Sequence, residues 1–294
     1  MAASMSEPVD GYLTARGIRL HYLDWGGAGP PLLLLHGLAS NAHIWDLTAP
    51  YLASRFRALA VDQRGHGRSD KPDGEDAYTF AEVTADLAAL VAALGLGRPV
   101  VAGHSWGGGV AAQFAADHPR LAAAIVLVDG GFAQLSSAEG MTWEKAEEMM
   151  RPPDIDGVKV DVFLRMARLW PDVKDIWSEQ LGQMILTNFE IVDGRIYRRL
   201  PIAKHMKIVR AIWDQDTSGL WQRIECPVLM VPAISSDSAA RPGWNERKLQ
   251  GIEDARGKLR DATVHVMTDT IHDIPVQRPR ELAEAIIGFA ARLA

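Results

Sequence analysis

Gly103-His104-Ser105-Trp106-Gly107 has the pattern G-x-S-x-G, and it lies between a short apolar run (100–102) and a segment with helical spacing (110–116). In a tight turn from a strand into a helix, a serine is held in a strained conformation and its neighbours must be small. The two flanking glycines meet that demand. Such a turn lifts the serine hydroxyl above the carboxyl edge of a sheet. The pattern therefore predicts that Ser105 is a nucleophile and not merely the cap of a helix.

Short strand-type runs alternate with longer helical segments on both sides of this turn. Strands are predicted at 18–23, 32–35, 56–61, 100–102, 124–128, 228–231 and 264–267, and helices at 80–94, 110–116 and 281–293. Several of the strands are apolar throughout, which is typical of strands buried on both faces. The alternation therefore predicts an α/β fold in which helices cover a mostly parallel sheet.

The alternation is interrupted between 132 and 222, where the sequence is mostly helical and rich in tryptophan. A chain of 294 residues is long enough for one large domain with an insertion, and two separate domains are less consistent with the pattern. We therefore expect one core domain formed by residues 1–131 and 223–294, with residues 132–222 inserted into it as a helical unit.

The composition limits the partners and the compartment. The formal net charge of -6 argues against nucleic acid, because phosphates favour clustered Lys and Arg. Cys226 is the only cysteine, so an intramolecular disulfide is impossible, which fits a reducing compartment. Residues 1–10 lack the pattern of a secretory signal, and the longest apolar run (30–35) is too short to span a bilayer. A cytoplasmic protein without a membrane span is expected, and no pattern indicates an oligomeric state.

The glycines of the turn also fit a different class, the dinucleotide-binding reductases. Gly103, Gly107 and Gly109 have the spacing G-x-x-x-G-x-G, and Asp129 follows at a suitable distance. That fingerprint normally opens the first βαβ unit, whereas several strands precede it here. Those reductases also need a tyrosine four residues before a lysine, and no tyrosine of this chain has that partner. We therefore predict no nucleotide cofactor.

Three further motifs give the chain a family resemblance. They are His36-Gly37 after an apolar strand, Asp62-x-Arg64-Gly65-x-Gly67-x-Ser69, and a late histidine in Ile271-His272-Asp273-Ile274-Pro275. Together with the turn at Ser105, their order resembles the α/β-hydrolase superfamily. The resemblance implies the α/β-hydrolase fold, with residues 132–222 as its helical cap. No group of His, Cys and acidic residues has metal-ligand spacing, so no metal is expected.

The resemblance also implies roles for individual residues. His272 occupies the place of the base that activates the serine. The backbone N–H groups of Leu38 and Trp106 correspond to the oxyanion hole. His104 lies inside the turn and should point away from the serine's partner, and His66 is expected to make structural hydrogen bonds.

Two residues compete for the role of the acid that orients His272. The usual family location is the loop after 228–231, but Ala233 stands there in place of the turn glycine and Ser236 in place of the acid, with Asp237 one residue late. Asp129 ends the strand that follows the nucleophile's helix, and some branches of the superfamily resemble this placement. A strand end is a rigid position, so Asp129 is preferred and Asp237 is the alternative.

The predicted reaction is acyl transfer through a covalent Ser105 ester. Haloalkane dehalogenases and epoxide hydrolases need a carboxylate as nucleophile, so a serine favours a carboxylesterase or a lactonase. The tryptophans of 132–222 and the Met-rich stretch 141–150 predict a pocket for a hydrophobic small molecule. Arg195, Arg198 and Arg199 could bind a carboxylate, and we interpret them as a solvated face. The alternatives are a carbon–carbon bond hydrolase and a non-catalytic small-molecule receptor.

Overall fold

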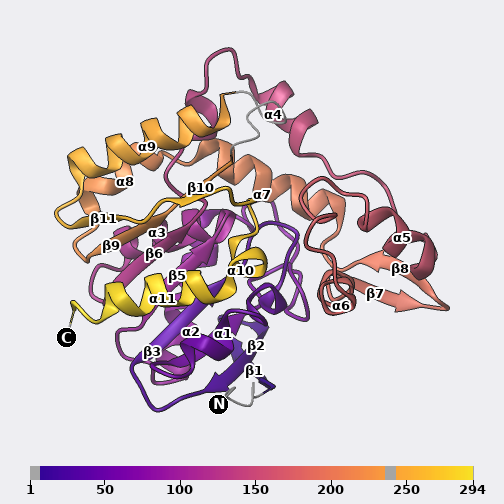
Figure 1. The fold of residues 1–294 in the computed structure, drawn as a ribbon, viewed down its shortest axis with the longest axis horizontal. Coiled ribbons are helices and arrows are strands. Elements are labelled where there is room, and N and C mark those ends of the chain that lie inside the picture. The colour runs from indigo at the N-terminus through magenta and orange to yellow at the C-terminus, as the bar shows by residue number, and fades with distance from the viewer. Residues whose placement is uncertain (1–6, 236–242, 294) are drawn as a thin grey trace.

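The computed structural model describes residues 7–235 and 243–293, and its central feature is an eight-stranded sheet (Figure 1). The strand order is β1-β2-β4-β3-β5-β6-β9-β11. These strands are β1 (Val9–Ala15), β2 (Ile18–Gly26), β3 (Pro31–Leu35), β4 (Arg57–Val61), β5 (Val100–His104), β6 (Ala124–Val128), β9 (Val228–Val231) and β11 (Ala262–Val264). β2 pairs antiparallel with both β1 and β4, and all other neighbours are parallel. The predicted, mostly parallel sheet is confirmed.

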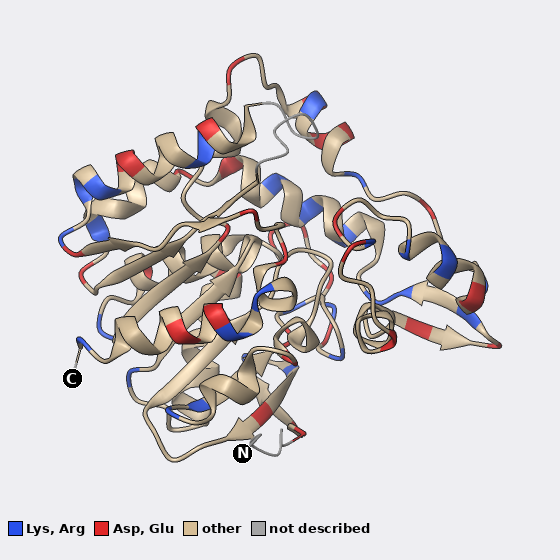
Figure 2. Ribbon diagram, viewed as in Figure 1, with Lys and Arg blue, Asp and Glu red and all other residues tan. Residues whose placement is uncertain are grey.

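Helices cover both faces of the sheet, because the buried strands carry apolar side chains on both sides. In β3, Leu33 and Leu35 pack in the cluster that contains α2 (Phe80–Ala93) and α3 (Trp106–Asp117), whereas Leu32 and Leu34 pack in the cluster of α1 (Ala49–Leu52) and α11 (Pro279–Ala290). This alternation follows from the two-residue period of a strand. Figure 2 shows that the charges lie mainly on the outer helices and loops while the central strands are largely uncharged.

Residues 132–222 connect β6 to β9. They form η2 (Leu135–Ser137), α4 (Trp143–Met150), α5 (Val160–Ala167), α6 (Glu179–Leu186), β7 (Phe189–Val192), β8 (Arg195–Arg198), α7 (Ile202–Asp214), α8 (Thr217–Leu220) and η3 (Trp221–Arg223). Figure 1 shows α5, α6 and the β7–β8 hairpin together at one end of the molecule. The hairpin was not predicted from the sequence. The division into a core and a cap domain stays a prediction.

The C-terminal part differs from the prediction in two places. The expected strand at 264–267 is interrupted: β11 ends at Val264, and Met267–Thr268 forms β12, which pairs with β10 (Ala233–Ile234) in a small separate sheet. A long helix, α9 (Trp244–Lys258), was not predicted. It is followed by β11, and the short helix α10 (Ile274–Gln277) leads into α11.

No helix within the described ranges combines the length and the apolar composition that crossing a membrane requires. The location of the protein in the cytoplasm stays a prediction. Cys226 is buried two residues before β9, and burial raises the pKa of its thiol to about 11, so it remains protonated at neutral pH.

Candidate active site

Ser105 occupies a strained turn between β5 and α3. Its backbone has φ 54° and ψ −121°, and its N–H donates to the Val128 carbonyl oxygen at 2.9 Å. A Cβ atom on Gly103 would lie 1.9 Å from the Gly107 carbonyl oxygen, and one on Gly107 would lie 2.6 Å from the His36 carbonyl oxygen. Both positions therefore require glycine. A positive φ at a non-glycine residue costs about 1–3 kcal/mol, which the surrounding packing must offset.

His272 lies between Ser105 and Asp129 in a continuous hydrogen-bonded chain. Its Nε2 atom is 2.9 Å from Ser105 Oγ, and its Nδ1 atom is 2.6 Å from Asp129 Oδ2. Burial alone would lower the pKa of His272, but the hydrogen bond and charge of the Asp129 carboxylate outweigh it and the pKa is raised. The structure thus brings together three of the predicted site residues, although His272 is 167 positions from Ser105 and 143 from Asp129.

The Asp129 carboxylate is buried and held from several sides. Its Oδ1 atom accepts from the Ala233 N–H at 2.9 Å, and Lys248 Nζ lies 2.7 Å from Oδ1 and 2.8 Å from Oδ2. Burial would raise the pKa of Asp129, and the contacts with His272 and Lys248 lower it below its ordinary value, so the group is a carboxylate at neutral pH. The alternative acid, Asp237, lies outside the described residues.

Sequence reasoning missed two contributors to this environment. Lys248 is buried on α9, 119 positions from Asp129, and no local motif marks it. Gly130 follows Asp129, and a Cβ atom on it would lie 2.2 Å from the Ser105 carbonyl oxygen. Gly130 and Gly131 follow Asp129 directly, and a pair of glycines at a strand end is a sequence signal of close backbone approach. Ala233 stands where the family resemblance implies a turn glycine, and its backbone N–H donates to the Asp129 carboxylate.

The predicted oxyanion donors lie beside the serine. Leu38 and Trp106 line the cavity at Ser105, and neither backbone N–H donates to any other residue in the described part of the chain. Trp106 opens α3, so its N–H has no partner within the helix. A Cβ atom on Gly37 would lie 3.5 Å from Ser105 Oγ, which shows how closely the segment before Leu38 approaches the hydroxyl.

The loop that begins at Asp62 supports this segment. The Asp62 carboxylate is buried and accepts from the N–H groups of Ala42 and Arg68, both at 2.8 Å, and from His21 Nδ1 at 2.7 Å. Burial would raise the pKa of Asp62, and these donors lower it far below its ordinary value. Gly67 has φ 47°, and a Cβ atom on it would lie 2.0 Å from the Asp62 carboxylate. The motif therefore holds loops in place and does not carry the chemistry.

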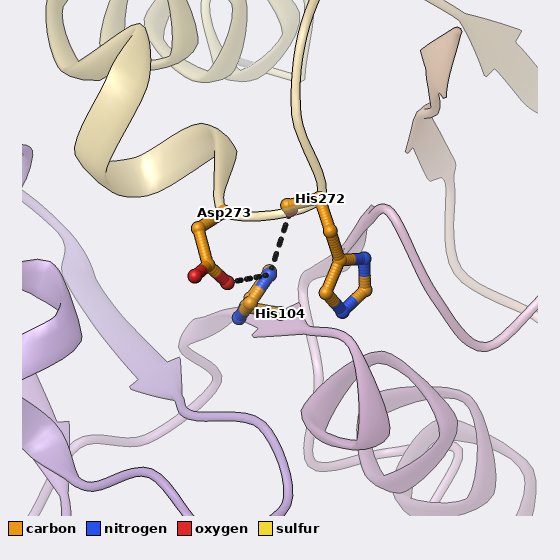
Figure 3. Close-up of side chains that lie close together, drawn as sticks. All are labelled: His104, His272 and Asp273. Carbon is orange, nitrogen blue, oxygen red and sulfur yellow. Dashed lines mark hydrogen bonds and ion pairs between the residues drawn. The ribbon is translucent and has the colours of Figure 1, made fainter. Parts of the chain in front are cut away.

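Two further histidines, His66 and His104, are buried. His66 makes structural hydrogen bonds, as predicted. The prediction that His104 points away from the serine's partner is wrong, because the His104 and His272 ring centroids are 4.9 Å apart. His66 accepts from the Ala39 N–H and stacks on Trp106, with ring centroids 5.1 Å apart. His104 donates from Nε2 to the His272 carbonyl oxygen at 3.0 Å and lies 3.6 Å from Asp273 (Figure 3). Burial and the neighbouring His272 lower the pKa of His104 to about 4, so it is neutral at neutral pH.

His104, His272 and Asp273 are close enough together to be considered as metal ligands. Figure 3 shows that the His272 ring extends away from Asp273, and both its nitrogen atoms are already hydrogen-bonded within the chain to Ser105 and Asp129. The Nε2 atom of His104 is bonded to the backbone. The cluster therefore serves to orient the loop that carries His272, and we assign no metal to it.

Two cavities meet at the serine. One of about 490 Å³ and one of about 740 Å³ share Leu38, Ser105 and His272 in their walls. Of the predicted pocket residues, Trp170 lines the smaller cavity, and Met149 and Met150 line the larger one. The arginines considered for carboxylate binding lie elsewhere, bonded to neighbouring backbone or side-chain oxygens: Arg195 to Gly157, Arg198 to Asp156 and Pro153, and Arg199 to Thr187.

Comparisons with known proteins agree with this architecture. Residues 30–157 match the family model described as alpha/beta hydrolase fold. The chain is 37% identical to Epoxide hydrolase 1 of Caenorhabditis elegans over 111 residues, which are 37% of this chain and 28% of that enzyme. The chain therefore matches less than a third of the length of that relative.

A second relative matches over most of its length. The chain is 39% identical to 2-(acetamidomethylene)succinate hydrolase of Mesorhizobium japonicum over 212 residues, covering 71% of this chain and 72% of that enzyme. Among solved structures, the crystal structure of E-2-(acetamidomethylene)succinate hydrolase superposes with a TM-score of 0.76 and 22% identity, over 97% of this chain and 99% of that one. The predicted superfamily and fold are confirmed, and the chain belongs to the alpha/beta hydrolase family of hydrolases.

Proposed function

We propose that the protein hydrolyses a carboxylic ester or lactone through a covalent acyl-Ser105 intermediate. The observation that supports this most is the chain of short contacts from the serine hydroxyl through His272 to the buried Asp129 carboxylate, at the junction of two cavities. A serine hydroxyl is a poor nucleophile at neutral pH and needs an adjacent base, and this arrangement supplies one.

The proposed reaction has two halves. Ser105 Oγ attacks the substrate carbonyl carbon while its proton passes to His272 Nε2, and Asp129 stabilises the imidazolium that forms. The negative charge that develops on the carbonyl oxygen is stabilised by the N–H groups of Leu38 and Trp106. The imidazolium then protonates the leaving alcohol as the bond to it breaks. Water, deprotonated by His272, attacks the acyl carbon, and the imidazolium returns its proton to Ser105 Oγ as the ester bond breaks and the acid is released.

The serine also bears on the choice among the activities named for the relatives. Opening an epoxide through an ester intermediate needs a carboxylate nucleophile, and this chain has Ser105 at that point of the fold. The Mesorhizobium relative is named for an acetamidomethylene succinate, so cleavage of an amide-like bond by the same acyl transfer is a second candidate, favoured by the 39% identity over 212 residues. The carbon–carbon hydrolase and receptor alternatives are outcomes of the test below.

We also propose that residues 132–222 act as a cap over a core formed by residues 1–131 and 223–294. In support, this segment contributes walls to both cavities at Ser105, Trp170 and Met184 in the smaller one and Met149 and Ile212 in the larger one. These side chains are apolar, which fits the hydrophobic substrate predicted from the sequence.

The test is a panel of acyl esters, lactones and N-acyl amides of graded size, with Ser105→Ala as the control. Turnover should be lost in this variant, typically by more than about 1,000-fold. Comparing Asp129→Asn with Asp237→Asn then identifies the acid, and loss of turnover in the latter alone would contradict our assignment. A folded wild type that binds panel members without hydrolysing any would instead favour carbon–carbon cleavage or a receptor role.

A further inference from the structure

The larger cavity contains hydrogen-bond donors that no described residue satisfies. Trp244 and Arg247 both line it and stand about one helical turn apart on α9. Trp244 Nε1 and Arg247 Nε are buried, and neither has a hydrogen-bond partner among the described residues. Buried N–H groups in native proteins are nearly always paired, so each unpaired one requires an explanation. Two such donors on one helix, beside a cavity at the serine, point to an acceptor group carried by a ligand.

Among the described charged side chains that line the larger cavity, Arg247 has no ion-pair partner. Of the other charged groups in its walls, Lys248 and Asp129 neutralise each other at 2.7 Å. The Arg247 guanidinium lies over the Trp244 ring, with Cζ 4.9 Å from the ring centroid, and forms no ion pair with any carboxylate that the structure describes. A guanidinium with unpaired donors is suited to a carboxylate, because its planar fork matches the two carboxylate oxygens.

The described walls of the smaller cavity contain no lysine or arginine. The charged side chains in its walls, besides the histidines, are the acidic ones of Asp172 and Asp273. Arg247, a cationic partner for an anionic group, therefore lies in the wall of the larger cavity and not of the smaller one. The larger cavity also has apolar side chains in its walls: Phe80, Phe132, Leu135, Met149, Met150 and Ile212. These surfaces suit a hydrocarbon spacer between the reacting carbonyl and the anionic group.

We propose that the larger cavity is a carboxylate-binding subsite, and that the substrate is an ester or lactone that also carries a free carboxylate. This inference rests on the proposed hydrolysis at Ser105. The carboxylate accepts hydrogen bonds from Arg247 and from Trp244 Nε1, and the apolar walls enclose the chain that joins it to the scissile bond. Arg247 is then a specificity-determining residue that binds the substrate without taking part in the bond changes.

The first experiment measures binding without turnover, in the Ser105→Ala background. Monomethyl adipate carries one carboxylate and dimethyl adipate carries none, and their dissociation constants are compared by calorimetry. We expect the monoester to bind about 10- to 100-fold more tightly than the diester, the usual worth of a hydrogen-bonded ion pair. Arg247→Gln should bring this ratio close to one. Arg247→Lys keeps the charge without the fork and should give an intermediate ratio.

Arg256→Gln is the matched control. Arg256 lies on the same helix, is exposed and pairs with Glu253 at 3.0 Å, so its replacement should leave the ratio unchanged. Trp244→Phe keeps the ring and removes the Nε1 donor, and should lower the ratio by a few-fold. The inference is overturned if the Ser105→Ala protein binds the two esters equally or binds neither. It is also overturned if Arg247→Gln and Arg256→Gln change the ratio of the two dissociation constants by the same factor.

Turnover by the wild type separates this inference from the proposed function. The substrates are the p-nitrophenyl ester of adipic acid with its second carboxyl free, and the same compound with that carboxyl methylated. Ser105-dependent hydrolysis of both at equal KM would support ester hydrolysis and overturn the subsite. Carboxylate-dependent binding by the Ser105→Ala protein, with no ester hydrolysis by the wild type, would support the subsite and overturn ester hydrolysis.

Discussion

Replacing Asp129 by asparagine should abolish most turnover for a reason that can be traced through the hydrogen bonds. His272 Nδ1 now donates to Asp129 Oδ2, so Nε2 is unprotonated and accepts from Ser105. The Ala233 N–H donates to the other oxygen, Oδ1, and keeps the amide oxygen there in the variant, whereas Lys248 contacts both oxygens. The amide nitrogen then faces His272 and donates to Nδ1. The imidazole proton moves to Nε2, which can no longer accept the serine proton, and kcat should fall about 1,000- to 10,000-fold.

The same replacement should also destabilise the fold, because Lys248 loses its counter-charge. Its side chain is only 10% exposed, and that of Asp129 is fully buried. Leaving one member of a buried ion pair uncompensated typically costs about 3–5 kcal/mol. For a chain of this size that corresponds to a fall in Tm of about 6–15 °C, at roughly 2–3 °C per kcal/mol.

The double variant Asp129→Asn with Lys248→Met separates the two effects. Without the ammonium, no unpaired charge remains and most of the lost Tm should return, whereas turnover should stay as low as in the single variant. Thermal unfolding followed by circular dichroism and initial rates on the best ester of the panel measure the two quantities. Recovery of turnover in the double variant would refute the tautomer argument, and a single variant as stable as the wild type would refute the ion-pair argument.

Three other predictions follow from the pKa values and the close contacts. Because only neutral His272 accepts the serine proton and its pKa is raised, kcat/KM should increase with pH through a midpoint above about 6.5, the ordinary histidine value, in a pH–rate profile. Gly130→Ala should lower both stability and turnover, since its Cβ atom would overlap Ser105, whereas Gly288→Ala in α11 meets no atom within 4 Å and should raise stability by about 0.5–1 kcal/mol in urea titrations. The pKa of Asp62 is lower in the folded than in the unfolded state, so its contribution to stability is present above about pH 4 and is lost as the pH falls further. The Asp62→Asn variant should therefore be less stable than the wild type at pH 7. The difference in unfolding free energy between the two proteins should become smaller as the pH is lowered.

The sequence predicted the elements whose signals are local. The serine turn needs glycine on both sides, and that requirement is visible as a pattern of five residues. β6 and β9 were located with the bounds that the structure gives, because a strand buried on both faces is an unbroken apolar run. The strand end at Asp129 was preferred as a rigid position, and the structure places its carboxylate against His272.

The elements that were missed have signals that are weak or hidden. In α9 the buried side chains are Lys248, Ile252 and Ala255, which have helical spacing, but the lysine in the first position conceals the apolar stripe. The β7–β8 hairpin turns at Asp193-Gly194, where both residues have positive φ, and this typical turn pair was overlooked within a helical context. The Lys248–Asp129 pair joins distant segments, so only the three-dimensional structure could reveal it.

The two cavities take their walls from different stretches of the chain, so each can change in sequence independently of the other. Within residues 132–222, the smaller cavity takes its walls from residues 170–189 alone, whereas the larger one takes them from residues 132–150 and 212–217. Outside that segment, α9 also lines the larger cavity. No residue of 132–222 belongs to both walls. Mutations within residues 170–189 can therefore change the shape of the smaller cavity while the walls of the larger cavity keep their sequence. A library confined to residues 170–189 would explore one half of the substrate at a time, which makes the segment a practical starting point for directed evolution.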